Sequence, residues 1–95
     1  MTRIVWTEPA VSDLDSIHSH IARDAVVYAD AVILDILDAV EQLALFPKSG
    51  RVVPELHDED TREIIVGNYR VMYDTHKDAV QILTVIHGAR LFLQS

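Results

Sequence analysis

The change in hydrophobic period at Pro47 constrains the fold more than any other feature of the sequence. Before it, apolar residues recur every three to four positions, which is typical of helices facing a core. After residue 61, β-branched and aromatic residues form short runs bounded by turn residues, which is typical of strands. Proline ends a helix, so the chain changes from helical to extended structure here. A helical first half followed by a sheet is therefore predicted.

Two helices are expected before this point, over residues 8–23 and 26–46. Thr7 or Glu8 can cap the first helix, since a side-chain oxygen can accept from the free amides of the first turn. The two residues between the helices leave room for nothing except a tight helical hairpin. A short strand is expected ahead of the hairpin, over residues 3–6.

Three strands are expected after the proline, over residues 62–66, 69–74 and 80–87. The first two are joined by Gly67-Asn68, a composition typical of hairpin turns. The element order β-α-α-β-β-β predicts an α+β fold, with a helical hairpin packed on an antiparallel sheet. With 95 residues and no linker, residues 1–95 are expected to form a single domain.

Two registers of the predicted hairpin remain open. A two-residue turn places Arg62 opposite Tyr73 and sends Arg70 to the other face of the sheet. A turn with one bulged residue gathers Arg62, Ile64, Arg70 and Met72 on one face. The residues do not distinguish these registers.

The last predicted strand is apolar on both faces, because Val80, Ile82 and Ile86 alternate with Leu83 and Val85. One face must pack on the helices. An uncovered apolar face usually marks a partner site, so we expect a partner to cover the other. The competing expectation is that strand 3–6 or the loop 48–61 folds over it.

The charge distribution narrows the possible functions. The net charge of −7 opposes a general affinity for nucleic acid. Residues 1–47 carry −6 and residues 48–95 only −1, so any cationic site is expected in the second half.

The absence of cysteine excludes disulfides and thiolate metal sites. No phosphate-binding loop or metal-binding motif is present, so no cofactor or metal is expected. The N-terminus lacks signal-peptide features and no apolar run would span a membrane, so a cytoplasmic protein is expected.

A set of polar side chains in the predicted sheet region could carry chemistry: Arg51, Arg62, Arg70, Tyr73, His87 and Arg90. Arginine binds phosphate or carboxylate, and tyrosine or histidine can transfer protons. The set would suit RNA cleavage, or binding of an acidic segment of a partner. By composition, ordinary sheet-surface charges paired with Glu63, Asp74 and Asp78 are the favoured interpretation.

Four segments resemble toxins of the ParE/RelE superfamily, in the right order and over essentially the whole chain: Trp6–Ala10, Phe46–Glu55, Arg62–Tyr73 and Val85–Arg90. The resemblance implies the helical-hairpin and sheet fold. It also implies the toxin half of a type II toxin–antitoxin pair of the plasmid-stabilisation kind, neutralised by a cognate antitoxin. Within the superfamily, ParE-type members poison DNA gyrase and RelE-type members cut mRNA in the ribosome.

The nuclease pattern of the superfamily is only partly matched. Its two alternating lysines correspond to Arg62 and Ile64, and its two arginines correspond to Arg70 and Arg90. A C-terminal tyrosine is missing, and His87 would be the substitute. We therefore expect a gyrase-directed, non-enzymatic toxin that meets DNA only through its antitoxin. The alternatives are a ribosome-dependent mRNA endonuclease and a degenerate toxin that only binds its antitoxin.

Target or antitoxin contacts are expected in and around the predicted meander, with the apolar part on an open sheet face around Met72, Leu83 and Val85 or their register alternatives. The full expected contact set is Arg51, Arg62, Arg70, Met72, Tyr73, Leu83, Val85, His87 and Arg90.

Overall fold

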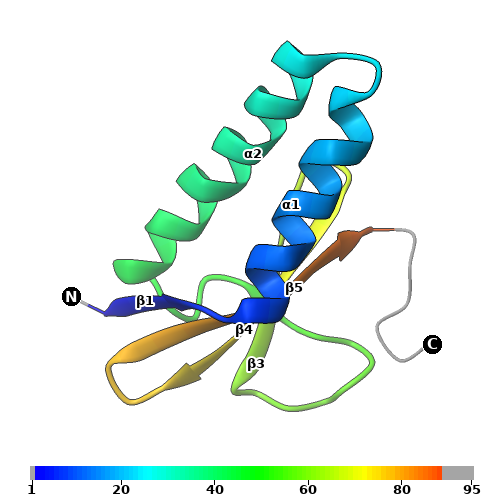
Figure 1. Cartoon of the computed structure of the whole chain (residues 1–95). Coiled ribbons are helices and arrows are strands. Elements are labelled where there is room, and N and C mark those ends of the chain that lie inside the picture. The colour runs from blue at the N-terminus through cyan, green and yellow to red at the C-terminus, as the bar shows by residue number, and fades with distance from the viewer. Residues whose placement is uncertain (1, 89–95) are drawn as a thin grey trace.

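The computed structural model describes residues 2–88, which form two helices packed on one face of a five-stranded sheet (Figure 1). The strand order in the sheet is β1-β5-β4-β3-β2. The elements follow the chain as β1 (Arg3–Trp6), α1 (Glu8–Ala22), α2 (Val26–Glu41), the 3₁₀ turn η1 (Gln42–Ala44), β2 (Arg51–Val52), β3 (Thr61–Val66), β4 (Tyr69–His76) and β5 (Ala79–His87). The predicted α+β fold is thus confirmed.

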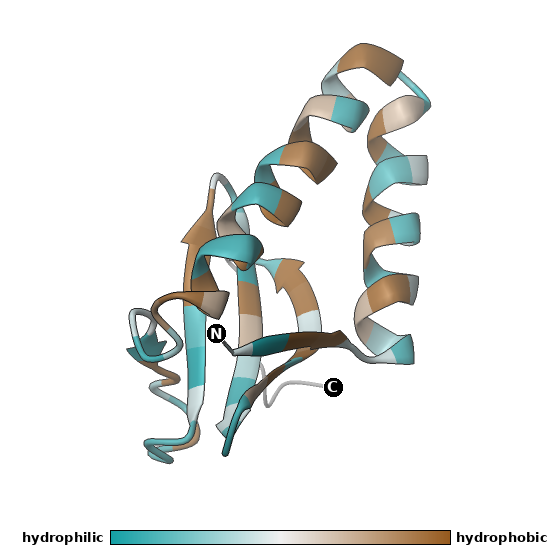
Figure 2. Cartoon of the chain, turned by 90° about the vertical axis from the view of Figure 1, so that its left-hand side faces the viewer, coloured by the Kyte–Doolittle hydropathy of each residue, from teal (hydrophilic) through white to brown (hydrophobic). Residues whose placement is uncertain are grey.

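The helical hairpin forms for the local reasons expected. The Thr7 side chain accepts from the amide of Ala10 and caps α1. The second helix is shorter than predicted, because α2 ends at Glu41 and the chain tightens into η1 before Pro47. Such 3₁₀ turns are frequent at helix ends. Apolar and polar bands alternate along both helices (Figure 2), and the inward side of α2 buries Ala29, Ile36 and Val40.

The sheet is mixed. β2 to β5 pair in antiparallel fashion, whereas β1 pairs with β5 in parallel, from Arg3 opposite Ala79 to Trp6 opposite Ile82. The short strand β2 lies within the segment predicted to be a loop, and it pairs Arg51 with Glu63. The antiparallel prediction therefore holds for β2 to β5. β1 can pair in parallel because the two helices that follow it form the long connection that a parallel pairing needs.

A two-residue turn at Gly67-Asn68 selects the first of the two predicted registers. Gly67 has φ +58°, a left-handed conformation that glycine adopts without strain. Arg62 lies opposite Tyr73, and Ile65 lies opposite Arg70. Since neighbouring residues of a strand face opposite sides, Arg62 and Arg70 lie on opposite faces of the sheet.

A β-bulge explains why simple alternation along β5 predicts apolar residues on both faces of this strand. Met72 pairs with Thr84 and Tyr73 with Ile82, so Leu83 is the extra residue of β5. The bulge shifts the alternation by one position. As a result Val80, Ile82 and Val85 all join the core, which they share with α1 and α2.

The sheet face opposite the helices is covered by the chain itself around Met72. Val53 and Met72 are fully buried, and Glu55 in the segment after β2 binds Arg70 on this face. The open apolar face predicted around Met72, Leu83 and Val85 is therefore wrong: Met72 is covered, Leu83 is half-buried, and Val85 belongs to the helix-facing core. Folding-over of the loop 48–61, the competing expectation, is what the structure shows.

Within the described residues, neither helix has the length and apolar character needed to cross a bilayer.

Candidate functional site

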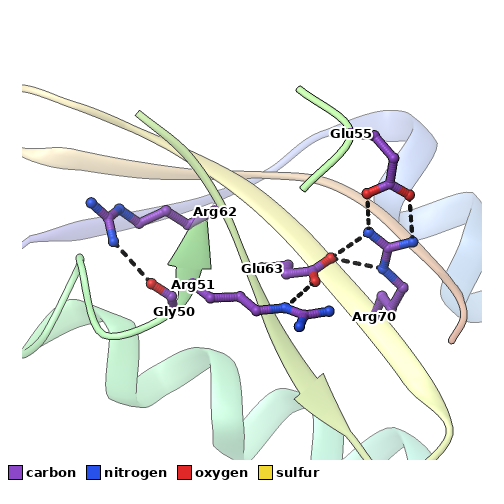
Figure 3. Close-up of polar contacts among 6 residues, drawn as sticks. All are labelled: Gly50, Arg51, Glu55, Arg62, Glu63 and Arg70. Atoms are coloured by element: carbon purple, nitrogen blue, oxygen red, sulfur yellow. Dashed lines mark hydrogen bonds and ion pairs between the residues drawn. The ribbon is translucent and has the colours of Figure 1, made fainter. Parts of the chain in front are cut away.

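Four charged side chains meet on the sheet face opposite the helices, and we call them the Arg70 network: Arg51, Glu55, Glu63 and Arg70 (Figure 3). They come from β2, the segment after it, β3 and β4. Glu63 of β3 pairs with Arg51 of β2 on one side and with Met72 of β4 on the other. Arg70 lies two positions from Met72 along β4 and therefore on the same face of the sheet. Strand pairing therefore brings together three of the four, and the segment after β2 adds Glu55.

Arg70 is the centre of this network. Its Nε donates to Glu63 Oε1 at 2.7 Å, and Nη2 lies 2.7 Å from the same oxygen. Its Nη1 and Nη2 donate to the two oxygens of Glu55 at 2.9 and 2.8 Å, a bidentate pair. The other oxygen of Glu63 accepts from Arg51 Nε at 2.5 Å. Two arginines and two glutamates thus compensate each other.

Burial makes this compensation necessary. The Glu63 side chain is 0% exposed and that of Arg70 is 5% exposed, whereas that of Arg51 is 61% exposed. The hydrogen bonds to Glu55 raise the pKa of Arg70 further above its usual range, against an opposing effect of burial. A guanidinium held in this way is charged, and its nitrogens face two carboxylates of the protein itself. It is therefore not presented to an external phosphate.

Arg62, on the other face, is also occupied. Its Nε donates to the carbonyl of Glu59 at 2.9 Å, and its Nη1 donates to the carbonyls of Gly50 at 3.0 Å and Lys48 at 3.3 Å. In Figure 3 its side chain points away from the Arg70 network. Arg62 therefore links the segment before β2 to the segment before β3.

Tyr73, opposite Arg62, is fully buried. Its hydroxyl accepts from the amide of Gly50 at 3.0 Å. Burial raises the pKa of this tyrosine, and the Gly50 contact and the charge of Arg62 partly oppose the rise. The neutral phenol is thus part of the core and far from ready to transfer a proton at neutral pH.

The remaining predicted site residues do not form one surface. His87 is exposed at the end of β5, where its ring makes an edge contact with Tyr69 at a centroid distance of 5.8 Å. Arg90 lies outside the described residues. Of the predicted contacts that lie within residues 2–88, only Arg51 and His87 are exposed, and Arg51 borders an open groove of about 460 Å³ beside Ile65. Ile65 is 55% exposed.

Two members of the Arg70 network were not predicted as site residues. Glu63 was expected only as a surface partner of arginine, and its burial could not be foreseen. Glu55 lies 15 residues from Arg70, and no local pattern links them. Between residues 2 and 88, no group of three or more histidine, aspartate or glutamate side chains could hold a metal ion.

Sequence comparisons with known proteins place the chain among toxins, and a structural comparison matches its fold. Residues 4–92 match the family model described as ParE toxin of type II toxin–antitoxin system, parDE. The chain is 32% identical over 92 residues to Toxin RelE2 of Caulobacter vibrioides, covering 96% of this chain and 100% of that protein. A solved chain of the chromosomal ParDE system from P. aeruginosa has the same fold, with a TM-score of 0.76 and 22% identity, covering 92% of this chain and 96% of that one.

Proposed function

Since the chain belongs to the ParE toxin family of type II toxin–antitoxin systems, we propose that it arrests growth by binding DNA gyrase in the cytoplasm, and that it is not an mRNA nuclease. ParE-type members of the superfamily act on gyrase. The family match supports this half of the proposal, and the state of the two arginines supports the other half.

The observation that argues most strongly against a nuclease is that Arg62 and Arg70 lie on opposite faces and are both occupied by the protein's own acceptors. Cleavage of a phosphodiester needs cations aimed together at the charge that develops on the phosphate. The third nuclease position, Ile64, packs against the hydrophobic core. A net charge of −7 also opposes docking on ribosomal RNA.

The nuclease remains the second candidate because a relative that shares 32% identity with this chain is named Toxin RelE2. The two candidates separate with the purified full-length chain. It is added to ribosomes programmed with a defined mRNA, and in parallel to DNA gyrase with supercoiled and relaxed plasmid.

We expect gyrase inhibition or trapped cleaved DNA, and intact mRNA. Arg23→Gln, which changes an exposed charge at the end of α1, is the matched control and should leave gyrase inhibition unchanged. Cleavage of the mRNA at discrete codons, without an effect on gyrase, would replace the proposal with the nuclease.

The partner is a cognate antitoxin, and we propose that apolar burial supplies most of its affinity. Exposed apolar side chains are concentrated on α2, where Val27 is 84% and Leu34 59% exposed, with Ile65 on the opposite side of the sheet. Arg51, whose side chain is 61% exposed, is a predicted contact that can reach antitoxin carboxylates with charge-assisted bonds. Through the antitoxin the toxin would meet DNA indirectly.

Titration of the toxin with its cognate antitoxin tests this mode of binding. We expect a clearly negative heat-capacity change and modest salt dependence. Affinity that collapses in high salt, with a heat-capacity change near zero, would show a mainly electrostatic complex instead.

A further inference from the structure

An open cavity of about 780 Å³ lies at the end of the sheet remote from the β3–β4 turn. It is formed where the segment after η1 meets the turn between β4 and β5, and the described Arg70 network contributes nothing to its lining. Binding sites for small molecules fall in this range of volumes. None of the residues named in the function proposed above lines this cavity.

The chain has only two lysines, and both line this cavity. Lys48 comes from the segment before β2 and Lys77 from the β4–β5 turn, 29 positions later in the sequence. Both are exposed, and neither has an ion pair within residues 2–88. In an acidic protein whose buried arginine is neutralised internally, two uncommitted ammonium groups at one cavity make a place where an anion can bind.

The wall of the cavity is held in place before any ligand arrives. Arg62 binds the carbonyls of Lys48 and Gly50 and so fixes the loop that carries the first lysine. The amide of Thr75 donates to the carbonyl of Asp60 at 2.9 Å and fixes the acidic turn against β4. Little ordering is therefore left for binding to accomplish, which favours affinity.

Lys77 has a backbone conformation that is costly for a lysine. Its φ of +54° lies in the left-handed region, where glycine or asparagine is preferred. A two-residue turn between antiparallel strands requires such a conformation at its first position, and Lys77 occupies that position between His76 and Ala79. The second lysine is thus placed at this turn although other residues would be less strained there.

An aromatic ring completes the cavity. Phe46 is 61% exposed and lies among the lining residues, together with the hydroxyl of Ser49 and the carboxylate of Asp60. An exposed aromatic side chain offers a stacking surface for a base. Lysine offers a point charge for phosphate, and a carboxylate can accept from ribose hydroxyls or base amino groups.

We propose that this cavity binds a nucleoside phosphate, with the base on Phe46 and the phosphates between Lys48 and Lys77. The ligand is a free nucleotide or a nucleotide of a single strand, since both present the same chemistry. An acidic peptide fits less well, because Phe46 would be left without a role. The proposal is independent of the gyrase proposal.

Calorimetric titration and amide chemical-shift mapping of the full chain test the proposal, with three probes: adenosine diphosphate, inorganic pyrophosphate and a ten-residue oligothymidylate. We expect saturable binding of adenosine diphosphate or the oligothymidylate, with shifts confined to residues 46–49 and 75–77. Tighter binding of the oligothymidylate would identify a single strand as the source, and tighter binding of the diphosphate a free nucleotide.

Variants test which residues contact the phosphates and which residue contacts the base. Lys48→Gln with Lys77→Gln should weaken every probe at least about tenfold, since both phosphate contacts are lost. Phe46→Ala should weaken the nucleotide probe by roughly fivefold or more, because base stacking is lost, and leave pyrophosphate unchanged. The controls are Leu45→Ala, an exposed apolar neighbour outside the lining, and Arg23→Gln, an exposed cation at the far end of α1.

Three results would overturn the proposal: no saturable binding of any probe at millimolar concentration, shifts that map to another part of the protein, or unchanged affinity in the double lysine variant. All these positions are exposed, so the variants should fold, and unchanged thermal unfolding confirms it.

Discussion

Replacement of Arg70 by methionine tests whether the Arg70 network supports the fold. The substitution removes four contacts of 2.7 to 2.9 Å and leaves Glu63, whose side chain is 0% exposed, with the solvent-exposed Arg51 as its remaining partner. Breaking a buried ion pair by removing one partner costs about 3–5 kcal/mol. A domain of this size has a total stability of roughly 5–15 kcal/mol. The variant should therefore lose a large fraction of its free energy of unfolding.

A second substitution separates loss of a partner from loss of packing. In Arg70→Met with Glu63→Leu, no buried charge remains without a partner, and Glu55 can turn toward solvent because its segment lies at the surface. Replacing a whole buried pair by apolar residues is often close to neutral. The double variant should therefore be clearly more stable than Arg70→Met.

Urea unfolding followed by circular dichroism and by the fluorescence of Trp6, the single tryptophan, measures these differences. Arg23→Met is the control for loss of an arginine, and its exposed position predicts a change below about 0.5 kcal/mol.

The reasoning is refuted if Arg70→Met unfolds within about 1 kcal/mol of the wild type, or if the double variant is no more stable than the single one. A stable Arg70→Met protein that has lost all toxicity would further show that Arg70 is a functional cation, in contradiction to the structural role derived above.

Three other substitutions test separate parts of the structure. Gly50→Ala should destabilise the fold by about 1–3 kcal/mol, because a Cβ there would lie 2.6 Å from the Tyr73 hydroxyl; Gly67→Ala, whose Cβ meets nothing within 4 Å, should cost only the strain of its positive φ, and a larger loss at Gly67 than at Gly50 in thermal unfolding would contradict this. Asp13→Ala should cost about 1.5–3 kcal/mol in urea unfolding, because its carboxylate accepts from a β5 hydroxyl at 2.6 Å and a β5 amide at 2.9 Å; an unchanged midpoint would mean that these bonds do not hold α1 on the sheet. Asp74→Asn should stabilise the protein at neutral pH, since burial raises the pKa of Asp74 and its Oδ1 has no partner among the described residues. Because the folded-state pKa is raised, the wild type regains this stability as the pH falls through that pKa. A gain in stability that persists unchanged in acid would refute the reasoning.

Much of the fold could be read from local patterns in the sequence. The helical hairpin follows from apolar spacing and a Thr7 cap, and the β3–β4 hairpin from Gly67-Asn68 at its turn. These features depend on residues within a few positions of one another, so their physical cause is present in the sequence itself. The order of the elements then left few possible arrangements, and the observed layers of helices and sheet are one of them.

Tertiary packing decided what local patterns left open. The bulge at Leu83 moves Val85 into the core with Ile82, and period-two alternation cannot show such a shift. The parallel pairing of β1 and the burial of Met72 depend on contacts between distant parts of the chain. Each lowers the free energy only in the assembled structure, where apolar surface leaves water together.

The arginines show the same division at the candidate site. In the sequence, Arg51, Arg62 and Arg70 are three equivalent cations near predicted strands. In the structure, one is exposed, one binds backbone carbonyls and one is buried between two glutamates. The sequence alone determined that six of the eight basic residues lie in the second half of the chain. Burial and register decided which cations can meet a partner, because a charge removed from water must find its counter-charge inside the protein.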